Sequence, residues 1–219
     1  MTLVKPNFLS LIPIKTEFFF NDTNLAIGTS FFYERDNNLY LISNWHNFAG
    51  RNPMTGKPQS STAGVPNKIK CRLILDKEFL EWSDYTFDLC DKDGIPRWFQ
   101  HPREGRIIDV AALKVELPSK FKKLEINQYK FTDMRVEIAQ DVFILGFPIG
   151  IAGRKELPVW KRGSIASEPG GNYPRILIDT ATRKGMSGAP VIMLNLLLKC
   201  NTSYIRKYEV PTLKAGGKE

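Results

Sequence analysis

The chain has 219 residues, of which 42% are hydrophobic and 25% are charged. These proportions are typical of a soluble globular protein, and the length suffices for one large domain or two small ones. No stretch approaches the roughly 20 apolar residues that a membrane span needs. Residues 1–20 lack the continuous apolar segment and the small-residue cleavage site of a secretory signal. We therefore expect neither membrane association nor secretion.

The net charge of +8 is concentrated in the C-terminal third of the chain. Residues 151–219 contain 12 basic and 5 acidic side chains, whereas residues 1–150 contain 19 and 18. A basic surface can attract nucleic acid or acidic partners through its electrostatic field. Because no basic motif interleaved with aromatic residues accompanies the charge, we interpret it as a solvated surface. Nucleic acid is not expected as a partner.

The cysteines and histidines limit the chemistry and indicate the compartment. Cys71, Cys90 and Cys200 are odd in number and widely spaced, so they cannot build a framework of several disulfides. We predict a reducing, cytoplasmic location and interpret each cysteine as a core or surface thiol. The sequence has no zinc-ligand spacing and no phosphate-binding glycine loop, so we expect neither a metal nor a cofactor.

The pattern along the chain predicts an all-β protein. Short runs rich in Phe, Ile, Val, Leu and Tyr are separated by clusters of Asn, Asp, Gly and Pro. The expected strands are residues 25–33, 39–43, 70–75, 106–116, 142–146, 164–167, 175–179 and 189–194. Such a series of short strands favours a β-sandwich or barrel. Between the strands we expect an exposed loop over residues 52–67, a tight turn at Glu104–Gly105 and a connector over residues 118–130.

A candidate nucleophile lies in residues 185–190, Gly-Met-Ser-Gly-Ala-Pro. Small residues around Ser187 leave its hydroxyl unshielded and let backbone N–H groups converge beside it, as acyl transfer requires. A serine also needs a base, and the chain contains two histidines. His46 follows an apolar run that we expect to break into a turn at Asn47, whereas His101 is assigned to the surface or to structure.

Asp109 is the candidate for the acid that orients the imidazole. It lies in the strand-like stretch 106–115, where an ionised carboxylate needs a partner. The partner is either His46 or, in a simpler interpretation, the neighbouring Arg106. Four acids in a loop-like stretch are rivals: Asp84, Asp88, Asp91 and Asp93.

Ser187 and His46 also admit structural interpretations. A serine in a glycine-rich turn often bonds to its own backbone, and a histidine beside Trp45 fits a packed core. We favour catalysis because the order His46, Asp109, Ser187 along the chain is one of the known orders of a Ser-His-Asp triad.

Four segments resemble trypsin-like serine peptidases of the chymotrypsin fold, nearest to the intracellular and bacterial HtrA-like branch and without a PDZ domain. Residues 28–32 with 40–46 resemble the strand pair that leads to the catalytic histidine. Residues 109–115 resemble the strand that carries the catalytic aspartate. Residues 142–150 resemble the opening of the second barrel, and residues 185–191 are similar to the family's Gly-x-Ser-Gly-Gly-Pro segment.

The resemblance implies two six-stranded-type antiparallel β-barrels packed side by side, with the site in the groove between them. Residues 1–118 would form the N-terminal barrel with the histidine and the aspartate, and residues 119–130 the connector. Residues 131–219 would form the C-terminal barrel with the serine. The tail after residue 190 has no clear glycine-rich strand, so either the second barrel is abbreviated or the chain is a fragment.

The same resemblance assigns roles to individual residues. His46, Asp109 and Ser187 would form the catalytic triad of a serine endopeptidase. The backbone N–H groups of Gly185 and Ser187 would form the oxyanion hole. The expected partner is a protein or peptide substrate. The alternative is a chymotrypsin-fold module that binds a peptide or protein and is catalytically weak or inactive.

The base of the specificity pocket and the residue before the serine depart from the digestive members of the family. Ala181 and Thr182 would lie at the base of the specificity pocket, where no acid is present. We therefore expect a small or medium apolar side chain before the cleaved bond rather than Lys or Arg. Met186 replaces the aspartate that pairs with a freed N-terminus in zymogen-activated members, so we do not expect activation by removal of a propeptide.

Overall fold

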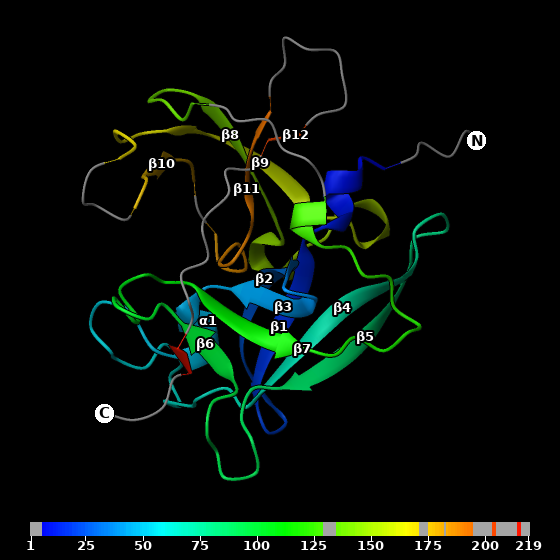
Figure 1. Cartoon of the computed structure of the whole chain (residues 1–219), viewed down its shortest axis with the longest axis vertical. Coiled ribbons are helices and arrows are strands. Elements are labelled where there is room, and N and C mark those ends of the chain that lie inside the picture. The colour runs from blue at the N-terminus through cyan, green and yellow to red at the C-terminus, as the bar shows by residue number, and fades with distance from the viewer. Residues whose placement is uncertain are drawn as a thin grey trace.

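The strands of the chain form two antiparallel sheets, one above the other in Figure 1. The computed structural model describes residues 6–128, 135–170, 175–181 and 183–194, together with the backbone of two short strands at 203–204 and 214–215. The first sheet contains β1 (Ile14–Phe20), β2 (Thr23–Arg35), β3 (Asn38–Ser43), β4 (Lys68–Asp76), β5 (Glu81–Asp88), β6 (Trp98–Gln100), β7 (Ala111–Val115) and β13 (Lys214–Ala215). The second contains β8 (Asp141–Gly146), β9 (Val159–Ile165), β10 (Ile178–Asp179), β11 (Val191–Leu194) and β12 (Ser203–Tyr204).

The strand orders are β13-β6-β7-β3-β2-β1-β4-β5 and β10-β9-β8-β11-β12. The prediction of an all-β chain with two antiparallel β-structures side by side is confirmed. Within the described residues the first sheet has eight strands, one of which, β13, adds to its edge through β6. Much of residues 195–213 lies outside the described residues, and with it the predicted end of the second barrel.

The helices are short. They are α1 (Trp45–Ala49) and the 3-10 turns η1 (Phe8–Leu11), η2 (Ile126–Gln128), η3 (Pro148–Gly150) and η4 (Arg154–Glu156). None of the described helices is both long and apolar enough to span a membrane.

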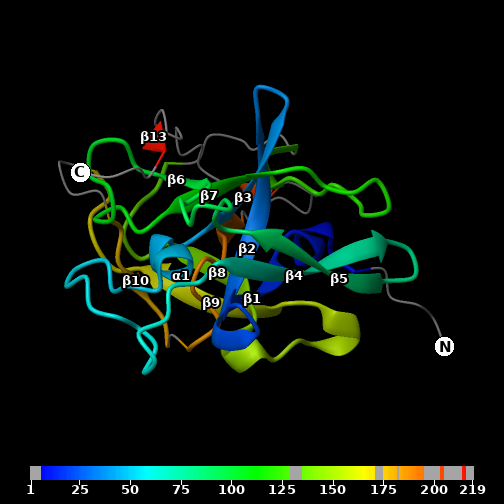
Figure 2. The same ribbon diagram turned by 90° about the horizontal axis from the view of Figure 1, so that it is seen from below.

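Strand β2 is the longest strand described and belongs to two hairpins. Its first part pairs with β1 as far as Ser30, and its second part pairs with β3 from Phe31 onwards. The turn between β2 and β3 has positive φ at both Asp36 and Asn37, as a tight hairpin turn requires. Figure 2 shows β2 crossing the molecule and this hairpin projecting from the rest of the sheet.

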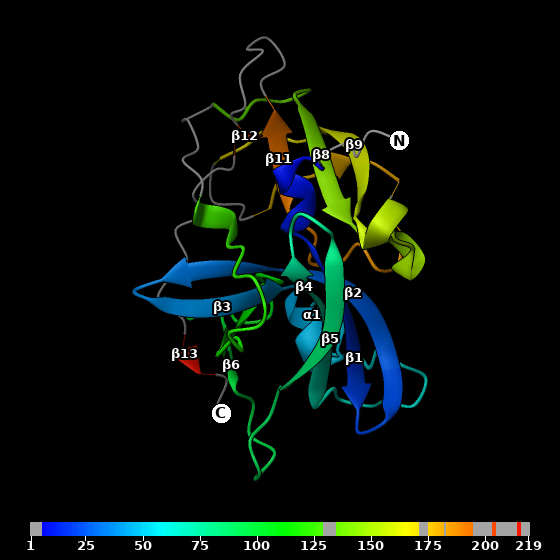
Figure 3. The same ribbon diagram turned by 90° about the vertical axis from the view of Figure 1, so that its right-hand side faces the viewer.

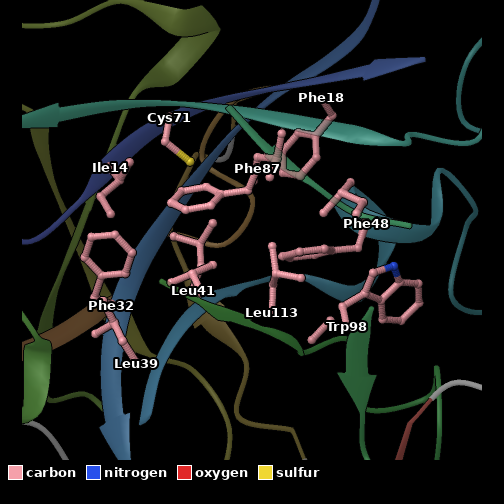
Figure 4. Close-up of a cluster of buried hydrophobic side chains, with 14 of the residues drawn as sticks. Ile14, Phe18, Phe32, Leu39, Leu41, Phe48, Cys71, Phe87, Trp98 and Leu113 are labelled. Carbon is pink, nitrogen blue, oxygen red and sulfur yellow. The ribbon is translucent and has the colours of Figure 1, made fainter. Parts of the chain in front are cut away.

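The core of the first sheet is built from large apolar side chains (Figure 4). In β1 buried and half-buried residues alternate, as expected for a strand with one face on a core. The Phe48 ring of α1 packs edge-on against Phe18, with ring centroids 5.8 Å apart, and also lies 5.9 Å from Trp98. Such aromatic pairs add specific geometry to the apolar area that they bury, so they fix α1 against the sheet.

The second sheet has smaller cores, one of which is completed by the N-terminal segment. Leu9 of η1 packs with Leu145 and Ile192, all three of them buried. The indole N–H of Trp160 also donates a hydrogen bond of 2.9 Å to the hydroxyl of Ser10. Figure 3 shows this blue segment beside β8 and β11 before it enters β1. The N-terminal segment therefore packs against the second sheet and leads into the first.

Several predicted elements were wrong or incomplete. The predicted turn at Asn47 is the helix α1, which ends at Gly50 with a left-handed φ of 62°. The strand expected from residue 106 begins only at Ala111, because residues 102–108 form turns with a positive φ at Gly105. Strands β1, β5 and β6 were not predicted at all.

Candidate active site

His46 is placed by the short helix α1 directly after β3. Its ring Nδ1 lies 2.7 Å from Oδ2 of Asp109, and its backbone N–H donates to Oδ1 of the same carboxylate at 2.9 Å. The amide side chain of Asn44, the residue before α1, donates to the backbone carbonyl of Asp109 at 2.6 Å. Three hydrogen bonds thus join the start of α1 to the segment that precedes β7.

The partner of Asp109 is therefore the histidine and not Arg106. Among the ion pairs of the described residues none joins Asp109 to Arg106, whose guanidinium lies beside the Gly56 backbone instead. The side chains of His46 and Asp109 are 16% and 25% exposed, so the pair is partly shielded and one edge reaches solvent. A carboxylate at Nδ1 fixes the ring orientation and leaves Nε2 as the basic nitrogen.

Two of the four rival acids, and the second histidine, are engaged elsewhere. The Asp84 carboxylate pairs with Arg72 at 3.2 Å on the exposed face of β5. The Asp91 carboxylate accepts two backbone N–H groups of its own turn. Nδ1 of His101 accepts the backbone N–H groups of Arg103 and Glu104, which agrees with the structural assignment of that histidine.

Ser187 lies in the loop between β10 and β11, and the first sheet holds two carbonyls of that loop. The Thr29 backbone N–H donates to the carbonyl of Ser187 at 2.8 Å, and the Thr29 hydroxyl donates to the carbonyl of Gly185 at 2.7 Å. The side-chain amide of Asn47 also donates to the Ser187 carbonyl at 3.2 Å. Because Asn47 follows His46 directly, the serine backbone is joined to the helix that carries the imidazole.

The carbonyl of Met186, between these two residues, and that of Lys184, before them, are held by donors from the half of the molecule that contains the second sheet. The N–H of Ile149 donates to the carbonyl of Lys184 at 2.6 Å, and the N–H of Ala189 donates to that of Met186 at 3.0 Å. Every peptide unit from residue 184 to residue 188 therefore has its carbonyl fixed by a donor. Since a peptide unit is planar, each of these bonds also fixes the direction of the N–H at the other end of the unit.

Two of those N–H groups face no described acceptor. Neither the Gly185 N–H nor the Ser187 N–H donates a hydrogen bond within the described part of the chain. Every buried side-chain nitrogen or oxygen in that part has a partner, and the Ser187 hydroxyl has none there, so the hydroxyl reaches solvent. No hydrogen bond between the described residues links the His46 ring to this hydroxyl.

The backbone conformation and the close packing of the serine loop require glycine at two positions. Gly185 and Gly188 have φ values of 90° and 85°, which residues with a side chain resist. A Cβ added at Gly188 would overlap the carbonyl oxygen of Thr29 and the hydroxyl of Ser43. The close approach of the serine loop to the first sheet therefore depends on a glycine at this position.

Met186 occupies a core position. It is 8% exposed and packs with Val142, Ile144 and Ile165 beneath the loop. Apolar packing thus lies where the resemblance would place an ion pair in zymogen-activated members. Of the two expected pocket residues, Ala181 is exposed, and Thr182 lies outside the described residues.

Sequence reasoning missed the residues that join the two halves: Thr29, Ser43 and Asn47. All three are buried, and their polar groups form one network. Each is a small polar residue inside an apolar run, which is a signal for a satisfied buried group, but the partner of Thr29 is 156 residues away in the sequence.

A family model described as a trypsin-like peptidase domain matches residues 28–195, which include His46, Asp109 and Ser187. The chain belongs to the trypsin-like peptidase family. None of the curated proteins compared with the sequence matches it. No group of His, Cys, Asp and Glu in the described residues could hold a metal ion.

Solved structures resemble this trypsin-like peptidase in fold. A thermostable serine protease, AL20, from an extremophilic microorganism has a TM-score of 0.50 and 13% identity, over 86% of this chain and 81% of that one. The inactive form of a serine mutant of Rv3671c from M. tuberculosis H37Rv has a TM-score of 0.43 and 15% identity, over 87% and 74%. The serine endoprotease from Yersinia pestis has 0.46 and 12%, over 88% of this chain and 54% of that chain.

Proposed function

We propose that the protein is a serine endopeptidase in which Ser187 is the nucleophile, His46 the general base and Asp109 the group that orients the imidazole. The observation that carries the proposal is the bond of 2.7 Å between His46 Nδ1 and Asp109 Oδ2. In addition, the Ser187 carbonyl accepts a hydrogen bond of 3.2 Å from the side chain of Asn47, the residue next to the histidine. A family match over residues 28–195 supports peptidase activity in general.

The proposed reaction follows from the positions of the donors and acceptors. Asp109 accepts the Nδ1 proton of His46, so the unprotonated Nε2 takes the hydroxyl proton of Ser187 as its oxygen attacks the peptide carbonyl carbon. The negative oxygen that forms accepts hydrogen bonds from the N–H groups of Gly185 and Ser187. The imidazolium then gives its proton to the leaving amine, and water releases the acyl group by the same steps.

The open N–H groups of the loop support the oxyanion role. Fixed donors in a partly shielded site need no reorganisation when charge develops, and each is worth on the order of 3 kcal/mol of transition-state stabilisation. The fixed carbonyls of Lys184 and Met186 hold these two donors in place. For the substrate, we propose a small or medium apolar side chain before the cleaved bond, since Ala181 lies at the expected pocket position.

The second candidate is a binding module of the same fold without strong catalysis. It is favoured by one observation: within the described residues the His46 ring and the Ser187 hydroxyl are not hydrogen-bonded. Catalytic hydrogen bonds are often long in the absence of substrate. The two candidates are therefore distinguished by the reactivity of Ser187 and not by whether this hydrogen bond is formed.

Labelling with a fluorophosphonate tests the proposal, because only an activated serine reacts. We expect one adduct on the peptide that contains Ser187 in the unmodified protein and none in Ser187→Ala. Ser167→Ala is the matched control, since the Ser167 hydroxyl only accepts the N–H of Leu177 in the second sheet, and it should label as the unmodified protein does. Absence of label from all three proteins would contradict the endopeptidase and support the binding module.

We also propose a cytoplasmic location. Cys71 is a free thiol buried in the first core, and burial raises its pKa well above the ordinary value. Cys90 is also a free thiol with a pKa raised chiefly by burial. Thiols that are not paired in a disulfide fit a reducing compartment. Recovery of the native protein from the culture medium or from an oxidising compartment, and not from cytosol, would contradict this location.

A further inference from the structure

Thr29 lies where β2 passes against the serine loop. Thr29 and its neighbour Ser30 are fully buried, and Gly28 on the other side is also buried. Burial of three consecutive residues breaks the alternation of a strand with one exposed face. A Cβ added at Gly28 would lie 3.3 Å from the Ser187 carbonyl oxygen. One face of β2 at this point is therefore covered by the serine loop.

Thr29 bonds to this loop through both its backbone and its side chain. The backbone N–H reaches the Ser187 carbonyl at 2.8 Å, and the hydroxyl reaches the Gly185 carbonyl at 2.7 Å. The same hydroxyl accepts the N–H of Phe147 at 3.3 Å. One side-chain oxygen thus joins β2, the end of β8 and the loop that carries the proposed nucleophile.

The Gly185 carbonyl is the one in this loop that most needs an external partner. Glycine rotates about its backbone bonds more freely than any other residue, and Gly185 has a φ of 90°. Its N–H is one of the two proposed oxyanion donors. This N–H belongs to the peptide unit between Lys184 and Gly185, which the Ile149 N–H holds through the Lys184 carbonyl. The Thr29 hydroxyl holds the next unit, between Gly185 and Met186, so the backbone of Gly185 is fixed on both sides and its N–H keeps its direction.

We propose that Thr29 is a positioning residue for the reaction: its hydroxyl holds the Gly185 carbonyl so that the Gly185 N–H faces the developing oxyanion. The inference rests on the proposed endopeptidase function. By this inference, the half of the molecule that carries His46 also helps to stabilise the negative charge that develops beside Ser187 in the other half. The imidazole and the carboxylate do not contact Thr29 in the described hydrogen-bond network, so their geometry is separable from its effect.

The test compares rates of fluorophosphonate labelling in Thr29→Val, Thr29→Ser and the unmodified protein. Valine keeps the shape and the backbone donor but removes the hydroxyl. Losing an oxyanion donor costs about 100-fold to 1,000-fold in rate, so loosening one should lower the labelling rate constant by about 10-fold to 100-fold. Serine keeps the hydroxyl and should stay within about threefold of the unmodified protein.

Thr16→Val is the matched control. Thr16 is also a fully buried strand threonine, and its hydroxyl accepts a hydrogen bond of 3.3 Å from Ser30 within the first sheet. Both valine variants should lower the melting temperature, but only Thr29→Val should lower the labelling rate. With a peptide ester substrate, Thr29→Val should lower kcat and leave KM within about threefold, because the lost bond acts in the transition state.

The outcomes separate this inference from the function on which it rests. If the unmodified protein does not label, the endopeptidase fails and the inference with it. If the unmodified protein labels and Thr29→Val labels at the same rate, or loses no more rate than Thr16→Val, the inference alone is overturned. Should Thr29→Val not fold, Thr29→Ala, which also keeps the backbone donor, is measured against the same expectations.

Discussion

The two halves of the molecule hold their proposed site residues in different ways. His46 and Asp109 are joined by two hydrogen bonds within the first half, and Asn44 adds a third to Asp109. Ser187 depends on the opposite half, because its carbonyl bonds to Thr29 and Asn47. The first pair is complete as soon as one sheet folds, whereas the serine loop takes its final shape only when the two sheets dock.

The hydrophobic cores of the two halves also differ in the size of their clusters. The first half buries large rings such as Phe18, Phe48 and Trp98 in one cluster (Figure 4). The second half has smaller clusters of mostly aliphatic side chains, such as Val142 and Met186, although Phe147 is also buried there. Aromatic side chains bury the most apolar area per residue, so we expect the first half to resist local opening more strongly. In the proposed mechanism, a site divided in this way makes catalysis conditional on contact between the halves.

The largest effect on the labelling rate is expected at Asp109, whose bonds to His46 lie entirely within the first half. Asp109→Asn places an amide donor beside Nδ1 of His46 and so favours the wrong tautomer. By analogy with the general Ser-His-Asp template, labelling by a fluorophosphonate should slow by about 10,000-fold while the melting temperature changes little. Asp84→Asn, which alters an exposed carboxylate paired with Arg72, should label as the unmodified protein does. A loss of less than tenfold in Asp109→Asn would show that this carboxylate does not orient the base.

A smaller effect is expected where the halves meet. Gly188→Ala adds a Cβ that overlaps Thr29 and Ser43 at a φ of 85°, so the serine loop must move away from the first sheet. A shift of about 1 Å in a reacting group costs on the order of 100-fold in rate, and labelling should slow by that factor. Gly94→Ala is the control, since Gly94 has a φ of 78° with nothing within 4 Å of an added Cβ. Equal labelling rates in the two variants would show that the close approach is not needed.

The smallest effect is expected in the second core. Met186→Ala leaves a cavity beneath the loop and should lower the free energy of unfolding, measured in urea, by about 2 kcal/mol. Labelling at low temperature should persist, because the hydrogen bonds of the loop remain. The control is Met54→Ala, at a side chain that is 60% exposed, and it should change the free energy of unfolding by less than about 0.5 kcal/mol. Similar values for both variants would argue against a packing role for Met186.

Sequence reasoning predicted the strands that carry dense apolar runs but missed β1, β5, β6 and the two-residue edge strand β13. Strand β1 places Glu17 on its outer face, where it pairs with Lys70. Strand β5 likewise places Asp84 on its outer face, where it pairs with Arg72. Cross-strand ion pairs of this kind depend on register, which a single sequence does not reveal. Strand β6 has three residues and is too short for any period to appear.

For the candidate site, the sequence motif predicted the reacting groups but not the residues that hold them in position. The neighbours of Ser187 and His46 in the sequence suggested a nucleophile and a base. The bond between Asp109 and His46 spans 63 residues, and that between Thr29 and Gly185 spans 156. Such contacts depend on how two sheets dock, which local propensity and spacing leave open. The buried threonine therefore looked like an ordinary strand residue.

The most direct test of the proposed mechanism is a crystal structure of the phosphonyl adduct on Ser187. The mechanism predicts that the phosphonyl oxygen lies about 2.7–3.1 Å from the N–H nitrogens of both Gly185 and Ser187. It also predicts that Nε2 of His46 lies about 3 Å from Oγ of Ser187, with Asp109 still bonded to Nδ1. An adduct whose oxygen points away from both N–H groups, with the imidazole turned from the serine, would contradict it.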